Sequence, residues 1–322
     1  MRFHLTKIAI ALSAVTIGTA ALADAPAVPK KSSYKVGFAQ TESNNPWRLA
    51  ESKSFQDIAA KCNWQVISTD AGGSAAKQVA DIDSLIAQKV DLLVFPPRED
   101  KPLVPAVMKA KKAGIPVILV DRDVDHALAK PTQDYITFIG SDFVDQGRRA
   151  AQALAKAMGS KGTIIELEGS TGASAATDRK KGFDAEIAKY PGMKIVASQS
   201  GDFNRDKGRQ LAQTLMQAHP DANAIYAHND EMAIGAITAI EAAGKKAGKD
   251  IMLVSIDGQR NALEAIVAGK LIATVQSSPY FGPAACKVAQ ASANGEKIPA
   301  WVKVEDKIYD ITNAAKDMDE GF

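Results

Sequence analysis

The feature that most constrains this chain is a regular alternation of short runs rich in Val and Ile with longer helical segments, from Tyr34 to about Gln276. Such an alternation predicts parallel sheets built from strand–helix–strand units. Several of the short runs are apolar almost throughout, which is typical of strands covered by helices on both faces. The ten strands that the pattern predicts most clearly are residues 35–39, 65–68, 92–95, 117–120, 136–139, 163–167, 194–197, 224–226, 252–256 and 272–275.

The chain length and a faint internal repeat predict two similar lobes. About 300 residues exceed the usual size of one hydrophobic core. Residues 110–121 (AKKAGIPVILVD) and 243–257 (AGKKAGKDIMLVSID) each place a basic helix end and a Gly before a strand that stops at Asp. Residues 90–100 and 221–231 occupy equivalent places, each a strand followed by polar groups.

The fold class that follows is α/β, with two doubly wound parallel-sheet lobes joined by a short multi-strand hinge. No Gly/Ser linker separates the halves, so we expect the chain to cross between the lobes near Ser141, Ser277 and Asp310. The expected N-terminal lobe is residues 32–141 plus 278–311, and the expected C-terminal lobe is residues 142–277 plus 312–322.

The N-terminus has the features of a signal peptide over residues 1–23. Arg2 and Lys7 precede an uncharged run from Ile8 to Ala23, and Ala21-Leu22-Ala23 supplies the small residues that a signal peptidase needs. The mature chain is expected to begin near Asp24. A retained membrane anchor is the alternative, but the run is short and rich in small residues, and no Cys beside the cleavage point suggests lipidation. Nothing later in the sequence is long and apolar enough to span a bilayer.

The charge balance argues against a polyanionic partner. The chain carries 39 basic and 37 acidic residues, and Arg2 and Lys7 lie in the leader, so the mature chain carries 37 of each. Nucleic-acid binders normally show a basic excess, which is missing here. The composition therefore predicts a small ligand and no nucleic-acid partner.

The two cysteines, Cys62 and Cys286, leave a choice open. Two thiols do not make a disulfide scaffold, although a secreted chain permits disulfides. Cys62 follows Phe55, Ile58 and Ala59 at helical spacing, so we interpret it first as a small buried residue. A bridge to Cys286 is the second interpretation.

Polar side chains gather directly after the predicted strands. In open α/β sheets, ligands bind outside the carboxyl ends of the strands. The segments at these ends are residues 40–48, 70–74, 98–100, 121–123, 141–142, 169–179, 202–205, 228–230, 257–259 and 276. They combine Asp, Asn and Gln acceptors with Arg donors and two aromatics, Trp47 and Phe203. An uncharged polyol needs this combination, because each hydroxyl donates and accepts and the C–H faces are apolar.

Each of these residues also has a simpler interpretation. Asp, Asn and Ser after a strand often cap the next helix, although Arg122 and Arg179 cannot do so. Trp47 and Phe203 are core residues in that interpretation. Catalytic alternatives are weakly supported, because the four His residues show no metal-ligand spacing and no phosphate-binding loop is present. Paired carboxylates such as Asp121 and Asp123 could serve a glycosidase, but with Arg122 between them they are better suited to stay ionised and accept hydrogen bonds. We therefore expect no metal, no cofactor and no enzymatic activity.

Several motifs resemble one family of binding proteins. They are TESNNPWR (41–48), VDRD (120–123), GASAATDRKKGF (172–183), SQSGDFNRDKG (198–208), YAHNDEMAIGAI (226–237) and SIDG (255–258). Together they resemble the periplasmic sugar-binding proteins of the ribose/galactose type, also called periplasmic binding protein type I or the peripla_BP_4 group. The sequence is especially similar to the galactofuranose-binding receptors of bacterial ABC importers, and the resemblance runs from about Tyr34 to the C-terminus.

The resemblance implies a monomeric periplasmic receptor that closes on a monosaccharide and delivers it to an inner-membrane ABC permease. It implies that the sugar is contacted by Gln40, Trp47, Arg48, Asp121, Arg122, Arg179, Phe203, Asn229, Asp257 and Gln276. Galactofuranose is the leading ligand, because Pro96 stands where ribose receptors have Asn. A sensing role and a sugar-modifying enzyme are the alternatives. A repressor of the same fold would carry a DNA-binding helix pair where this chain has its leader.

Overall fold

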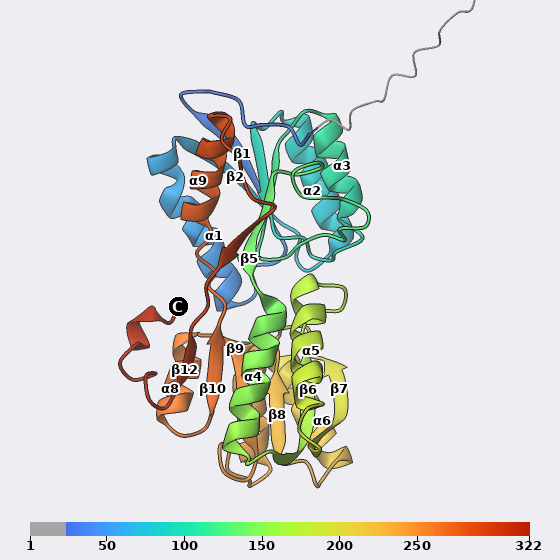
Figure 1. Cartoon of the computed structure of the whole chain (residues 1–322), viewed down its shortest axis with the longest axis vertical. Helices are drawn as coiled ribbons and strands as arrows, with labels where there is room; N and C mark the ends of the chain where they lie inside the picture. The colour runs from blue at the N-terminus through green and yellow to red at the C-terminus, as the bar shows by residue number, and fades with distance from the viewer. Residues whose placement is uncertain (1–23) are drawn as a thin grey trace, which may run out of the picture.

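The computed structural model describes residues 24–322, which form two α/β lobes, one above the other in Figure 1. Each lobe contains a six-stranded sheet. In the first sheet the strand order is β11-β5-β4-β3-β1-β2, and in the second it is β12-β10-β9-β8-β6-β7. The two sheets have the same topology: strands β1 to β5 occupy the same places in the first sheet as β6 to β10 in the second. Strand β4 therefore corresponds to β9. The predicted fold class is confirmed.

The first sheet is entirely parallel and is buried between two helical layers. Its strands are β1 (Tyr34–Gln40), β2 (Trp64–Asp70), β3 (Leu92–Phe95), β4 (Val117–Val120), β5 (Thr137–Ser141) and β11 (Trp301–Val304). Val36, Phe38 and Val94 face a core that includes Phe55 of α1 and Ala285 of α9. Leu93 and Phe95 face the opposite core, which includes Leu85 of α2 and Val107 of α3. The covering helices are α1 (Pro46–Ala59), α2 (Ala75–Ala87), α3 (Val104–Lys112) and α9 (Gly282–Ala293).

The second sheet repeats this plan, with one antiparallel edge. Its strands are β6 (Lys161–Glu168), β7 (Gly192–Ser200), β8 (Ala224–Ala227), β9 (Met252–Asp257), β10 (Ala273–Gln276) and β12 (Ile308–Asp310). Strand β12 pairs antiparallel with β10, and the other neighbours pair parallel. Its helices are α4 (Phe143–Ala157), α5 (Ser174–Ile187), α6 (Arg205–Ala218), α7 (Asp230–Ala242) and α8 (Arg260–Val267). Among the described residues, no helix combines the length and apolar character needed to cross a bilayer.

All ten strands expected from the sequence are present, most with one to three additional residues at an end. Strands β11 and β12 were not expected. Strand β11 is exposed at every second residue and β12 has only three residues, so neither produces a strong apolar signal. The predicted signal peptide, residues 1–23, lies outside the described residues.

The chain crosses between the lobes three times. It leaves the first sheet at Ser141 and enters α4 at Phe143, and it returns between Gln276 and Gly282. The third crossing lies between Val304 and Ile308. It was expected at Asp310, and the first lobe was expected to extend to residue 311. Both boundaries are wrong, because Ile308–Asp310 already pairs with β10 of the second sheet.

Gln146 of α4 ties the three crossings together. It is 1% exposed, and its Nε2 donates to the Gln276 carbonyl oxygen at 3.1 Å and to Asp306 Oδ2 at 2.8 Å. Asp306 Oδ1 also accepts from Ser141 Oγ at 3.0 Å. One glutamine and one carboxylate therefore hold the first, second and third crossing segments at fixed spacing.

Cys62 and Cys286 form a disulfide, so the first interpretation of Cys62 as an unpaired buried residue was wrong. Cys62 ends the short 3-10 helix after α1, and Cys286 lies in α9. Helices α1 and α9 pack side by side on one face of the first sheet (Figure 1). The bridge links residues 224 positions apart and attaches the late helix α9 to the early part of the same lobe.

Removing the bridge should lower stability without removing the fold. We expect the Cys62→Ala/Cys286→Ala protein to lose about 2–4 kcal/mol of unfolding free energy, because a disulfide restricts the unfolded chain. Urea unfolding measures this. A reductant should destabilise the parent and leave the variant unchanged; equal midpoints for reduced and oxidised parent protein would contradict the assignment.

Asp306 should make stability depend on pH. Burial raises the pKa of Asp306 from 3.8 to about 6, although Gln146 and Ser141 donate to it. The folded state then holds the proton more tightly than the unfolded state, so the contribution of Asp306 to stability falls as pH rises from about 4 to about 6. The measurement is the difference in unfolding free energy between the parent and Asp306→Asn. That difference should change over this interval and be flat above pH 7; a difference that is constant from pH 4 to pH 7 would refute the assignment.

Candidate functional site

A cavity lies between the facing edges of the two sheets, where the carboxyl ends of their parallel strands meet. It encloses about 350 Å³ of empty space, including the part open to solvent. Both lobes contribute walls. The lining residues are Glu42, Asn45, Trp47, Arg48, Asp121 and Arg122 from the first lobe, and Ala175, Arg179, Phe203, Asn229 and Asp257 from the second.

The structure brings most of the predicted site residues to this cavity. Those that line it are Trp47, Arg48, Asp121, Arg122, Arg179, Phe203, Asn229 and Asp257. The expectation that polar residues after the strands gather at one edge of each sheet therefore indicates the correct region of the molecule. Helix capping and cavity lining turn out to be compatible roles, since Asn45 and Asn229 do both.

Gln40 and Gln276 do not line the cavity. Gln40 is buried behind it, and its Nε2 donates to Glu51 Oε2 and to Ser52 Oγ, both at 3.0 Å. Gln276 points toward the third crossing, where its Nε2 donates to the Tyr309 hydroxyl at 2.9 Å and its Oε1 accepts from the Lys307 N–H at 3.2 Å. Each ends a strand, but its side chain points away from the cavity, so the prediction of direct contact is not supported by the geometry.

In the first lobe, Arg48 connects two carboxylates. Its Nη1 lies 2.8 Å from Glu51 Oε2, and its Nη2 lies 2.7 Å from Asp121 Oδ2. Burial disfavours the charged form of Arg48, but the neighbouring carboxylates outweigh it and raise the pKa of Arg48. Asp121 is held at a φ of 57°, which turns its carboxylate from the end of β4 toward Arg48.

Arg122 is the least satisfied cation of the cavity wall. Its Nε lies 3.6 Å from Asp121 Oδ2 and makes no hydrogen bond among the described residues, while its Nη1 donates to the Arg98 carbonyl oxygen at 3.3 Å. Burial and the nearby Arg48 lower the pKa of Arg122 to about 10, so it stays charged at neutral pH. An unsatisfied guanidinium N–H at a cavity wall favours a ligand with oxygen acceptors.

In the second lobe, Arg179 is fixed by three groups. Its Nε donates to Gln146 Oε1 at 2.9 Å, its Nη1 donates to the His228 carbonyl oxygen at 2.6 Å, and its Nη2 lies 3.6 Å from Asp257 Oδ1. Burial, opposed by Arg179, raises the pKa of Asp257 well above its usual range. Gln146, which holds the crossings, therefore also positions a cavity residue.

Phe203 provides the apolar face of the second lobe. The guanidinium carbons of Arg122 and Arg179 lie 5.4 Å and 5.8 Å from its ring centroid, so cations from both lobes flank the ring. Its φ is 55°, an uncommon value for an aromatic residue. A Cβ on Gly169 would meet the Phe203 ring at 2.0 Å, so only Gly permits this ring position.

Trp47 combines the two roles considered for it. It is 5% exposed, its indole N–H donates to the Ser277 carbonyl oxygen at 2.8 Å, and its ring packs near Phe281. It also lines the cavity, with the Arg48 guanidinium 4.6 Å from its ring centroid. Trp47 thus links the second crossing to the cavity wall.

Sequence reasoning missed three lining residues. Glu42 and Asn45 lie inside the polar segment 40–48, so a signal for them existed. Ala175 has no polar group and could not have been found by a search for hydrogen-bonding residues. Asp123, considered as the partner of Asp121 in a glycosidase, does not line the cavity; it accepts from the Tyr135 hydroxyl at 2.8 Å instead.

The two lobes also contact each other through residues that do not line the cavity. Arg98 of the first lobe lies 2.9 Å from Asp202 of the second, and the Asp123 N–H donates to Ser174 Oγ at 2.9 Å. The Asp100 N–H donates to the Gly172 carbonyl oxygen at 2.8 Å.

Within residues 24–322, no group of three or more His, Cys, Asp or Glu side chains is arranged to hold a metal ion. The groups that the cavity offers to a ligand are fixed N–H donors, carboxylate acceptors and aromatic surface.

Comparison with known proteins gives consistent matches. The family model described as a periplasmic binding protein domain matches residues 36–297. The ribose import binding protein of Bacillus subtilis (strain 168) is 35% identical over 86% of this chain and 88% of its own length. The galactofuranose-binding protein YtfQ of Escherichia coli (strain K12) is 38% identical over 77% of this chain and 79% of its own. The solved structure of an arabinose transporter's binding component from Shewanella sp. ANA-3, bound to α- and β-L-arabinofuranose, has a TM-score of 0.84 and 35% identity, covering 89% of this chain and 95% of its own.

Proposed function

The chain belongs to the family of periplasmic binding protein domains, as its motifs indicated, and on that premise we propose that it captures a neutral monosaccharide between its two lobes for an ABC importer. It acts by binding and release, as the curated relatives that share most of its length are import or sugar-binding proteins. We further propose that it works as a monomer in the periplasm after removal of residues 1–23.

The observation that carries this proposal is the balance of buried charge around the cavity. Arg48, Arg122 and Arg179 are each 2–4% exposed, and Asp121, Asp257 and Glu42 face them across the same space. Each of the three guanidinium groups lies near one of these carboxyl groups, so the wall presents donors and acceptors together. Its donors and acceptors are fixed, so it favours a ligand whose groups both donate and accept.

The aromatic side chains support a sugar among such ligands. Phe203 and Trp47 come from different lobes and present apolar surface beside charged donors. A sugar ring has C–H faces that pack on aromatic rings and a rim of hydroxyls that hydrogen-bond.

We propose galactofuranose, or a related furanose or pyranose, as the ligand. The relative described as galactofuranose-binding is 38% identical, and one similar solved structure holds a furanose, L-arabinofuranose. The ribose import relative keeps ribose in the set to be tested.

A binding screen tests the proposed function. Protein secreted from its host is incubated with pentoses and hexoses and followed by native mass spectrometry and thermal shift. A ligand present at 100 times its dissociation constant stabilises the fold by about 2.7 kcal/mol. We expect a neutral sugar to give such a shift and to be recovered unchanged. No shift with any neutral sugar, or chemical turnover of the bound one, would overturn the proposal.

Substitution of cavity residues should weaken binding without unfolding the protein. We expect Asp121→Ala, Arg179→Ala and Asp257→Ala each to lower affinity about 30- to 1,000-fold, because each leaves a buried partner unsatisfied. Phe203→Ala should have a smaller effect. Titration calorimetry with the sugar found in the screen measures this.

Asp145→Ala is the control for these variants. Asp145 lies in the first turn of α4, pairs with Arg148 and Arg149, and does not line the cavity. The Asp145→Ala protein should bind the sugar with the same dissociation constant as the parent. Parent-like affinity in all three cavity variants would place the sugar elsewhere.

Ligand should also shift the lobes toward the closed arrangement. A ligand that contacts both lobes binds the closed form more tightly than the open one. Small-angle scattering should therefore show a smaller radius of gyration with the bound sugar than without it. An unchanged radius would indicate that the lobes do not move on binding.

A further inference from the structure

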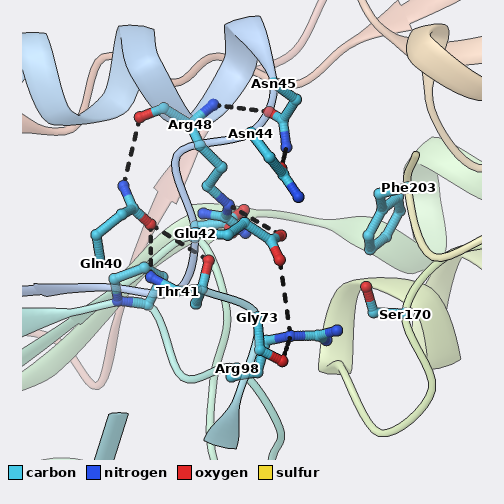
Figure 2. Close-up of polar contacts among 12 residues, drawn as sticks. Gln40, Thr41, Glu42, Asn44, Asn45, Arg48, Gly73, Arg98, Ser170 and Phe203 are labelled. Atoms are coloured by element: carbon cyan, nitrogen blue, oxygen red, sulfur yellow. Dashed lines mark hydrogen bonds and ion pairs between the residues drawn. The ribbon is translucent and has the colours of Figure 1, made fainter. Parts of the chain in front are cut away.

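Glu42 is a buried carboxylate at the cavity wall, and its side chain forms no hydrogen bond with any of residues 24–322. It follows β1, is 5% exposed and lines the cavity. Among residues 24–322, the shortest approaches of a cation to its oxygens are 3.8 Å from Arg98 Nε, 3.9 Å from Arg122 Nη2 and 4.0 Å from Arg48 Nε. Figure 2 shows Glu42 between Arg48 and Arg98, on the side of the first lobe that faces Phe203.

The neighbouring carboxylates differ from Glu42 in this respect. Asp121 accepts from Arg48 Nη2 at 2.7 Å. Glu51 accepts from Arg48 Nη1 at 2.8 Å and from Gln40 Nε2 at 3.0 Å. Buried acceptors are normally satisfied, and an unsatisfied carboxylate is costly. The oxygens of Glu42 are therefore free to accept hydrogen bonds from a molecule in the cavity.

The hydrogen bonds of the three surrounding arginines go to groups other than Glu42. Arg48 is bound to Glu51 and Asp121. Arg98 donates from Nε to the Gly73 carbonyl oxygen at 3.0 Å and from Nη2 to Asp202 of the other lobe at 2.9 Å. Arg122 donates to the Arg98 carbonyl oxygen. Their charge offsets that of Glu42, but none of their N–H groups donates a hydrogen bond to it.

From this geometry we infer that Glu42 is a ligand-binding, specificity-determining residue: it accepts a hydrogen bond from a ligand hydroxyl and disfavours any ligand that carries an acid group at that place. The inference deepens the proposed function and rests on it. A carboxylate accepts from a hydroxyl but repels another carboxylate. Because Arg48 and Arg98 already pair with Glu51, Asp121 and Asp202, the charge of Glu42 adds a repulsion against a ligand acid group at this place. Glu42 therefore favours a neutral sugar over the corresponding sugar acid.

The test compares Glu42→Gln with the parent on neutral and acidic probes. Gln keeps the size of the side chain and removes its charge. The probes are D-galactose, L-arabinose, D-ribose and D-fructose, with D-galacturonate and D-gluconate as the acids, each titrated by calorimetry. Affinity for the neutral sugar that binds the parent most tightly should fall about 10- to 100-fold, since hydrogen bonds to charged groups are the strong ones. The preference for that sugar over the acids should fall at least as much.

Glu264→Gln is the matched control. Glu264 is an exposed residue of α8 that pairs with Arg260 and does not line the cavity, so this variant makes the same change in net charge. It should bind every probe as the parent does. Unfolding midpoints without ligand, measured for all three proteins, show that the Glu42 variant is folded.

The outcomes separate the inference from the proposed function. If the parent binds a neutral sugar and Glu42→Gln binds it within twofold with the same preference over the acids, the inference is wrong and the function stands. If the parent binds none of the neutral sugars, the proposed function is wrong. In that case the role of Glu42 still requires that Glu42→Gln bind an acid more tightly than the parent does, and equal acid binding would overturn it as well.

Discussion

The structure depends on burying cations at the edges where two sheets face each other. Arg48, Arg122 and Arg179 are almost inaccessible to solvent, and a buried guanidinium is tolerated only beside carboxylates and carbonyl oxygens. The parallel sheets supply these partners, because Asp121 directly follows β4 and Asp257 ends β9, and these are equivalent strands of the two lobes. Both have positive φ, 57° and 142°, so the backbone is strained where it delivers charge to the cavity. The repeated fold thus produces a charge-matched cavity from two similar halves.

Much of the fold could be predicted from the sequence because central strands are buried on both faces and consist of apolar runs. The edge strands β11 and β12 lack that signal, and their existence depends on pairing with β5 and β10 far away in the sequence. The disulfide was not the first interpretation of the sequence for a related reason. The spacing around Cys62 indicates a buried helix face, but the identity of its neighbour depends on α9 packing against α1, which only the tertiary structure determines.

The site was predictable to the extent that position after a strand decides where a side chain lies. This position indicated correctly that Asp121, Arg122, Asn229 and Asp257 line the cavity. It failed for Gln40 and Gln276, because position does not determine direction: one side chain turns behind the cavity and the other toward the crossings. The role of Gln146 could not be predicted from the sequence, because Gln146 belongs to no recognised motif and does not follow a strand. Its importance comes from its place on α4, within reach of two crossings and of Arg179.

The three crossings also decide the order in which the molecule is completed. Helix α9, the cysteine it carries and strand β11 all belong to the first lobe, yet they lie after residue 281 in a chain of 322. A ribosome therefore produces the whole central part of the second lobe before the first lobe has its last helix and edge strand. Contacts between segments this distant in sequence form slowly. Folding from the N-terminus, one complete lobe after the other, is not open to this chain, because each sheet receives its last strand only from residues 301–310.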